Sequence, residues 1–196
     1  MTDKSTGILP TLALAVAIVA APPAFAVPIA YTEQVTATGS LGGVAFTDAT
    51  IVLQMHNDTG AVNVGPPAFP FFIIGTATVT VGGGPTATFK NPIGVIATSV
   101  VPGVEFFDET KDAQILLEES NSFAGYNLQA AIGPISGTAL PNKFANFPTS
   151  GGNLIITTAN AVGTFTASTS PTVSEPSALA LLGVALAGLA RRRKAA

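Results

Sequence analysis

The chain has 196 residues, 10% of them charged, with no cysteine and a formal net charge of −3. This length allows about one ordinary domain, and the missing cysteine excludes disulfides, thiolate metal sites and a cysteine nucleophile. Residues 27–171 carry three lysines against nine carboxylates, a net −6. Because nucleic-acid binding needs a basic footprint, we expect no nucleic-acid partner.

Residues 1–26 predict a secretory signal peptide. Lys4 supplies a positive charge near the start, and an apolar run follows over 8–21. Two prolines then interrupt the run, and Ala24 and Ala26 place small side chains at the positions that signal peptidase reads. We therefore predict export with cleavage after Ala26. The alternative, an N-terminal membrane anchor, is disfavoured because the apolar run is short for a span.

Residues 27–168 predict an all-β domain. The segment is rich in Thr, Val, Gly and Pro, and short strand-like runs recur between clusters of Gly, Pro and Asn. Such runs favour a pleated sheet punctuated by turns. Roughly eight to ten strands without intervening helices indicate a β-sandwich or jelly-roll-like body.

The first two strands of this body should form a hairpin. The runs 31–41 and 44–55 flank a Gly-Gly pair that is free to adopt positive φ. Apolar residues change parity within the second run, which predicts a β-bulge near 47–49. A turn is expected over 56–60.

Further strands follow along the chain. They are expected at 71–81, 86–90, 94–101, 114–118, 126–131, 154–158 and 163–167. The first has the clearest alternation, with apolar side chains at Ala77, Val79 and Val81 between threonines. The segment 108–120 allows a helical turn or a strand in its second half, and we favour the strand.

The C-terminal end has a linker over 169–173 and then a second targeting segment over 174–196. Ser174, Glu175 and Pro176 come first, an apolar stretch covers 178–190, and Arg191, Arg192, Arg193 and Lys194 follow. A basic cluster after an apolar helix stays cytoplasmic, so the body lies across the membrane. A helix over the apolar stretch would span about 20 Å of a hydrocarbon core of about 30 Å, too little for a relaxed permanent anchor.

This three-part layout resembles the PEP-CTERM sorting signal of Gram-negative bacteria. In that family a Pro-Glu-Pro motif precedes an apolar helix and a basic end; here Glu175 and Pro176 match its second and third positions, and Ser174 stands at the first. The resemblance implies recognition and cleavage by an exosortase, a membrane transpeptidase-like enzyme. It also implies transient anchoring in the inner membrane and delivery to the envelope, the outer surface or the medium. The alternative is a permanent tail anchor.

Two short patterns resemble catalytic motifs. Asp58 opens an Asp-Thr-Gly triplet, but aspartic-protease chemistry needs two such carboxylates and the chain has one triplet. His56 is the single histidine, and no Gly-x-Ser-x-Gly elbow exists to accompany it. We therefore interpret Asp58 as part of an Asx turn and His56 as a hydrogen-bonded loop residue.

One acidic segment is a weak candidate for calcium. Glu105, Asp108, Glu109 and Asp112 form a dense acidic cluster, with Glu118 and Glu119 beyond. Of these, Asp108, Glu109 and Asp112 are the candidate hard oxygen ligands. The calcium-loop pattern of the EF-hand is missing, so a solvated acidic loop is the favoured interpretation. We expect no resident metal and no cofactor.

These observations favour an exported structural or interaction protein without catalytic activity, with an exopolysaccharide as a candidate partner. The rival hypothesis is a secreted carbohydrate- or ligand-binding module with a permanent C-terminal anchor. Exposed aromatic side chains would favour the rival. The candidates are Phe69, Phe71, Phe72, Phe106, Phe107, Phe144 and Phe147.

Overall fold

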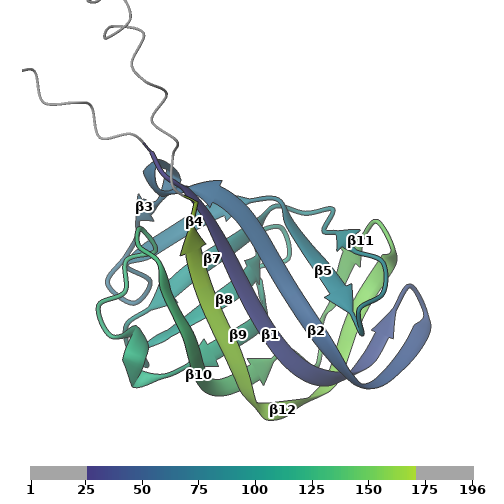
Figure 1. Cartoon of the computed structure of the whole chain (residues 1–196). Coiled ribbons are helices and arrows are strands. Elements are labelled where there is room, and N and C mark those ends of the chain that lie inside the picture. Colours follow the sequence, from purple (N-terminus) through teal and green to yellow (C-terminus); the bar gives the residue numbers. More distant parts are fainter. Residues whose placement is uncertain (1–25, 171–196) are drawn as a thin grey trace, which may run out of the picture.

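The computed structural model describes residues 26–170, and these form an all-β body (Figure 1). The strands are β1 (Pro28–Leu41), β2 (Val44–Asp58), β3 (Asn63–Val64), β4 (Phe71–Gly75), β5 (Ala77–Val81), β6 (Ala87–Thr88), β7 (Ile93–Thr98), β8 (Gly103–Asp108), β9 (Ala113–Glu119), β10 (Ile132–Pro141), β11 (Asn146–Thr149) and β12 (Gly152–Thr169). Two 3₁₀ turns, η1 (Thr59–Ala61) and η2 (Asn121–Phe123), complete the body. The all-β prediction is confirmed.

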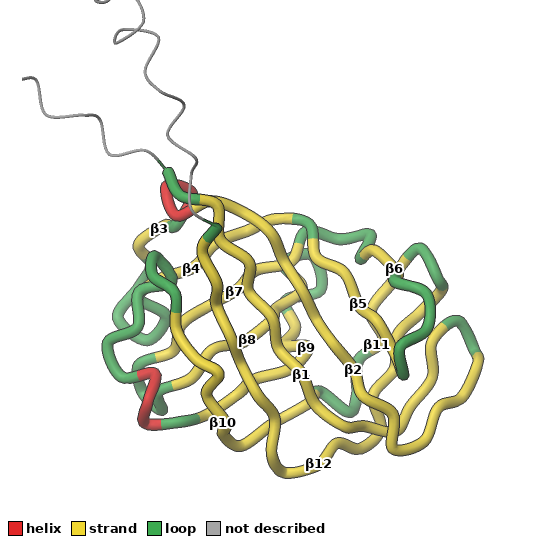
Figure 2. Tube along the Cα trace, viewed as in Figure 1, coloured by secondary structure: helices red, strands yellow, loops and turns green. Residues whose placement is uncertain are grey.

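The twelve strands form one antiparallel sheet that curls (Figure 2). Its order is β3-β4-β7-β8-β9-β10-β12-β1-β2-β5-β6, and β11 pairs with β12 outside this path. A sandwich divides its strands between two sheets, whereas here every described strand belongs to one hydrogen-bonded network. No helix formed by the described residues has the length and apolar character that crossing a membrane requires.

The predicted hairpin and bulge are confirmed at β1 and β2. Gly42 and Gly43 join the strands with φ of 60° and 83°, values that glycine adopts without a steric penalty. The pairing then shifts between Ala37↔Ala49 and Gly39↔Phe46, which leaves one more residue on β2 than on β1. That extra residue is the bulge.

The expected strand over 71–81 is wrong as a single element. The chain breaks after Gly75, so that β4 pairs with β7 while β5 pairs with β2. Ile73 and Ala77 both face the core. The alternation of buried and exposed side chains therefore continues from β4 into β5. For this reason side-chain periodicity alone cannot reveal the break between the two strands.

Other boundaries also differ from expectation. The segment 126–131 is a loop, in which Leu128 adopts a φ of 62°, outside the extended region. The two short strands expected over 154–167 are parts of the long β12, which is continuous because β1, β10 and β11 all pair with it. β8 was not expected, while β9 confirms the strand in the second half of 108–120.

The core lies on one face of the curled sheet and contains an aromatic group around Phe165. Its ring lies 5.6 Å from that of Phe123 and 6.3 Å from that of Tyr126, both edge-on, and 6.5 Å from that of Tyr31. The buried Tyr31 hydroxyl donates to the Leu128 carbonyl at 2.6 Å. These contacts hold the loop 124–131 against the sheet.

Both ends of the body lie together. β1 and β12 are antiparallel neighbours, with Ile29 opposite Thr169. The Ser170 backbone N–H donates to the Pro28 carbonyl at 3.0 Å. Residues 26 and 170 therefore lie at the same end of the body, and residues 26 and 27 contact η1, the red segment near the grey traces in Figure 2.

Candidate functional site

A pocket of about 370 Å³ lies on the face of β4, β7 and β8 that is opposite to the core. Phe72 on β4, Ile96 on β7 and Glu105 on β8 are successive cross-strand partners. Their neighbours Ile73 and Val95 point to the core instead. Strand alternation thus places these three side chains in one row on the outer face.

A glycine opens the hollow beside this row. A second row across the same three strands consists of Ile74 on β4, Gly94 on β7 and Phe107 on β8. Because its central residue is glycine, this row has no side chain in the middle. A Cβ at Gly94 would meet the Glu109 carboxylate, which lies over this gap. The missing side chain therefore makes room for the Glu109 carboxylate, which lines the pocket.

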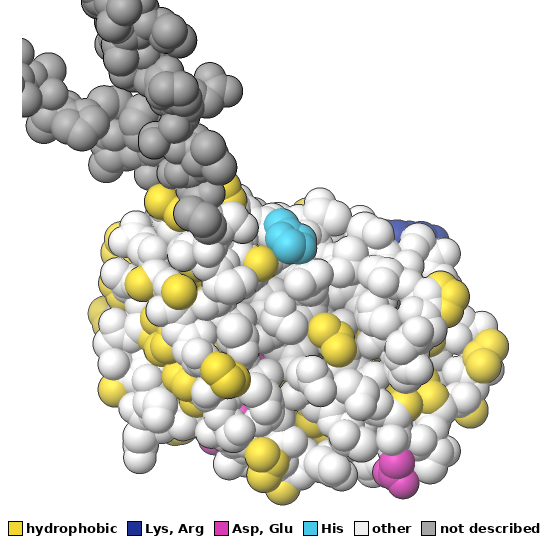
Figure 3. Space-filling view, in the orientation of Figure 1, with side chains coloured by type: hydrophobic (Ala, Val, Ile, Leu, Met, Phe, Trp, Pro, Cys, Tyr) yellow, Lys and Arg dark blue, Asp and Glu magenta, His cyan; other side chains and the backbone are white. Residues whose placement is uncertain are grey.

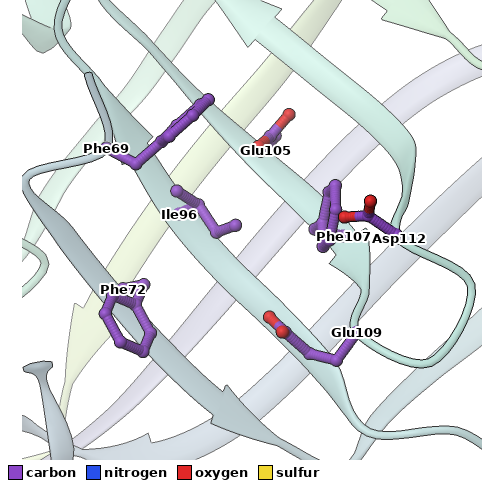
Figure 4. A pocket seen from close by; sticks show the side chains of 7 residues that line it. All are labelled: Phe69, Phe72, Ile96, Glu105, Phe107, Glu109 and Asp112. Atoms are coloured by element: carbon purple, nitrogen blue, oxygen red, sulfur yellow. The ribbon is translucent and has the colours of Figure 1, made fainter. Parts of the chain in front are cut away.

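The walls of the pocket come from two loops. Phe69, 44% exposed, comes from the segment before β4, and Glu109 and Asp112 come from the turn between β8 and β9. Figure 4 shows the three carboxyl groups at separate places around the apolar side chains of the pocket. The pocket lining contains no lysine or arginine.

Burial and mutual repulsion raise the pKa values of two of these carboxyls. Burial, and then the charge of Glu109, raises the pKa of Glu105 to about 7. Partial burial, and then the charges of Asp112 and Asp108, also raises the pKa of Glu109. Ionisation of these carboxyls is therefore unfavourable, and no cation in the pocket lining offsets this cost.

Two further carboxyls are enclosed in the core. Glu33 on β1 and Glu118 on β9 are fully buried, and neither oxygen of either group has a hydrogen-bond partner. Burial, and then the charge of Glu118, raises the pKa of Glu33 far above its ordinary value. Burial raises the pKa of Glu118 to about 7; the Gly137 N–H offsets part of this rise without meeting the geometry of a hydrogen bond.

The structure places the three residues of the calcium candidate, Asp108, Glu109 and Asp112, in two different environments. Asp108 is fully buried; its carboxylate accepts from the Asn91 amide and from the backbone N–H groups of Thr110 and Lys111. Glu109 and Asp112 line the outer pocket instead. No group of three or more His, Cys, Asp or Glu within residues 26–170 is arranged to hold a metal ion. The role found for Asp108 is to organise its turn.

The protease-like triplet forms a turn. The Asp58 carboxylate accepts from the Gly60 N–H at 2.9 Å, which confirms the predicted Asx geometry. His56 lies on β2 rather than in a loop, and it is exposed on the surface (Figure 3). Its position was therefore predicted wrongly, because β2 extends three residues beyond the expected end at Met55.

The seven aromatic candidates separate into several environments. Phe69, Phe72 and Phe107 line the pocket. Phe106 and Phe147 are core residues. Phe71 packs partly buried against the core, and Phe144 is 99% exposed away from the pocket lining.

The burial of Glu33 and Glu118 was not predicted from the sequence. The signal was present, because Glu33 shares the parity of Tyr31 and Val35, which face the core on β1. Glu118 likewise shares the parity of Leu116 on β9. The role of Gly94 had no comparable signal, since it depends on which strands lie on each side.

The expected sorting residues fall outside the described part of the chain. These are Ala24, Ser174, Glu175, Pro176, Arg191, Arg192, Arg193 and Lys194; Ala26 is described and exposed. Residues 172–194 match the model of the PEP-CTERM protein-sorting motif. No curated protein and no solved structure matches the chain.

The fold and the motif together define an exported all-β protein that is sorted through its C-terminal segment. In particular, the chain carries a PEP-CTERM sorting motif, which supports a PEP-CTERM protein and implies processing by an exosortase. The sorting signal supports export to the cell envelope or surface.

Proposed function

We propose that the β body is a non-catalytic structural or interaction domain displayed at the outer surface or in the extracellular polysaccharide matrix. The exosortase would cut its C-terminal segment after transient membrane anchoring. Signal peptidase would remove residues 1–26. No cofactor takes part in this function.

One observation carries this proposal. The sorting motif begins at residue 172, directly after β12 ends at Thr169. β12 lies between β10 and β1, so the sheet is complete before the motif starts. Cleavage within the motif would therefore release an intact domain.

The candidate catalytic groups support a role without chemistry. His56 is exposed on β2, and no described side chain hydrogen-bonds to it. Asp58 is engaged in its own turn. A nucleophile, a base and an orienting group are thus not assembled around either residue.

Mass spectrometry of the protein recovered from its producing cells tests the proposal. We expect a mature chain that starts at Val27 and ends between Thr169 and the apolar stretch 178–190. The variant Glu175→Ala should retain the C-terminal segment and accumulate in the membrane fraction. An unprocessed C-terminus in the wild-type protein would contradict exosortase release.

A second candidate function is a ligand-binding module that keeps a permanent C-terminal anchor. The outer pocket, with its aromatic and acidic lining, favours it. The same mass spectrum separates the two, because this candidate requires the segment 174–196 on the mature protein.

A further inference from the structure

We propose that the pocket formed by Phe69, Phe72, Ile96, Phe107, Glu105, Glu109 and Asp112 binds a cationic amino sugar. This inference goes beyond display at the surface. It does not depend on how the C-terminus is processed.

The first argument is the shape and chemistry of the pocket. Its volume of about 370 Å³ falls within the range of roughly 300–1,000 Å³ that is typical of small-molecule sites. Three phenylalanines and Ile96 supply the apolar surface. Aromatic rings suit the apolar C–H face of a sugar and also attract a cation above the ring.

The second argument is uncompensated charge. Glu105 is only 7% exposed and lines the pocket, and burial and then the charge of Glu109 raise its pKa to about 7. Lys111 is the nearest cation along the turn, but its ammonium group donates to Asn146 at 3.2 Å. A buried carboxylate without a partner is unfavourable. A ligand that brings positive charge would remove this cost.

The third argument is the distribution of the acceptors. The three carboxyl groups lie at separate places around the apolar residues (Figure 4). A sugar ring presents donors around its rim and apolar faces above and below. A lysine side chain presents its donors only at the tip. The arrangement therefore fits an amino sugar better than a single protein side chain.

Calorimetric titration of the full-length chain, held in nanodiscs of zwitterionic lipid, tests the proposal. The probe is a glucosamine tetramer in buffer at about pH 7, where both its amines and Glu105 are partly charged; the neutral comparison is the N-acetylated tetramer. We expect the charged probe to bind at least about 10-fold more tightly than the neutral one, at about 150 mM salt to screen non-specific attraction. Equal binding of the two probes, or no binding of either, would overturn the proposal.

Two substitutions of the same type provide the matched comparison. Asp112→Asn removes a charge from the pocket, whereas Asp48→Asn removes one from the β2 bulge. Both residues have positive φ, 51° and 48°, which asparagine tolerates. We expect Asp112→Asn to weaken binding of the charged tetramer by about 10-fold and Asp48→Asn to change it less than about 2-fold. Equal losses of affinity in the two variants would show that the tetramer is attracted to the overall negative charge of the protein. That result would contradict a binding site in the pocket.

Three further measurements distinguish an amino sugar from other ligands of the pocket. Phe69→Ala should weaken the binding of the charged tetramer, because the exposed ring is part of the pocket wall; an unchanged affinity would contradict sugar stacking.

An arginine tetrapeptide that binds more tightly than the amino sugar would instead indicate a protein partner. Displacement of the sugar by Ca²⁺ alone at about 1 mM would indicate a metal site. Thermal unfolding of each variant confirms that the fold is retained.

Discussion

At the scale of single residues, the unusual feature is a pair of carboxyls, Glu33 and Glu118, in the core. Neither forms a hydrogen bond or an ion pair within residues 26–170. Burial favours the protonated form of both, and the charges of Glu118 and then Glu105 further disfavour ionisation of Glu33. These two residues therefore make the stability of the body depend on pH.

The direction of this dependence follows from proton linkage. The pKa of Glu118 rises from 4.5 in the unfolded chain to about 7 in the folded one. Between these values the folded state binds more protons, so the free energy of unfolding falls as pH rises. Burial also raises the pKa of Glu33, so this residue adds to the fall.

We predict that Glu118→Gln flattens this pH dependence. The wild-type free energy of unfolding should fall by about 1–3 kcal/mol more than that of the variant between pH 4.5 and pH 7. Denaturant titrations across this range measure it. Glu119→Gln is the control, because the adjacent side chain points to the other face and remains half-buried. Identical slopes for all three proteins would show that Glu118 is hydrated when folded.

A second prediction concerns the buried tyrosine hydroxyl. Tyr31→Phe leaves the Leu128 carbonyl without its donor in the core. We expect a loss of about 1–2 kcal/mol in the free energy of unfolding. Tyr126→Phe, which removes a 3.0 Å bond to the Ala130 carbonyl at a partly buried site, should cost less. Chemical denaturation compares the two, and an equal loss would contradict the role of burial.

At the scale of elements, two turns pack against each other through glycines. Gly42 joins β1 to β2, and Gly152 begins β12 directly after the turn from β11. A Cβ at either residue would meet the backbone of the opposite turn. The close approach couples the two hairpins and explains why no side chain fits there.

We predict different costs for alanine at the two neighbouring glycines of the first turn. In Gly43→Ala the new Cβ has no atom within 4 Å, so only the positive φ is unfavourable. We expect the free energy of unfolding to fall by about 1 kcal/mol. In Gly42→Ala the new Cβ would also collide with the Gly151 carbonyl. We expect the free energy of unfolding to fall by about 3 kcal/mol. Thermal unfolding of both variants measures the difference. Equal costs would mean that the two turns can separate freely.

At the scale of the whole molecule, the adjacent ends of the body set a limit on processing. Thr166 and Ala167 of β12 pair with Thr32 and Tyr31 of β1, and Ala167 is buried. Loss of the last strand residues would expose core side chains and leave backbone groups of β1 unpaired. The domain needs β12 up to about residue 169.

We therefore predict that truncation has a sharp boundary. A stop after Ser170 should leave the thermal midpoint unchanged relative to the full chain, whereas a stop after Gly163 should prevent folding, because Phe165 and Ala167 would be lost from the core. Circular dichroism during heating measures both. A folded product from the shorter chain would show that the end of β12 is dispensable.

Sequence pattern identified much of the candidate site and of the fold. The Gly-Gly hairpin, the bulge, the Asx turn at Asp58 and the all-β class follow from local chemistry, because steric limits on φ and period-2 burial act within a few residues. The acidic turn and Phe69, Phe72 and Phe107 were recognised as candidates, but as separate features. Residues distant in the chain become one pocket only when β4, β7 and β8 lie side by side.

By itself, the sequence determined where the chain is routed and what class of fold it adopts. The sorting motif is a contiguous segment, residues 172–194, so it can be identified without knowing how the body folds. Only the tertiary structure decided that 71–81 divides between β4 and β5, that the Glu109 carboxylate lies over Gly94, and that the charge of Glu118 acts on Glu33. Each depends on pairing between distant strands, which local periodicity cannot specify.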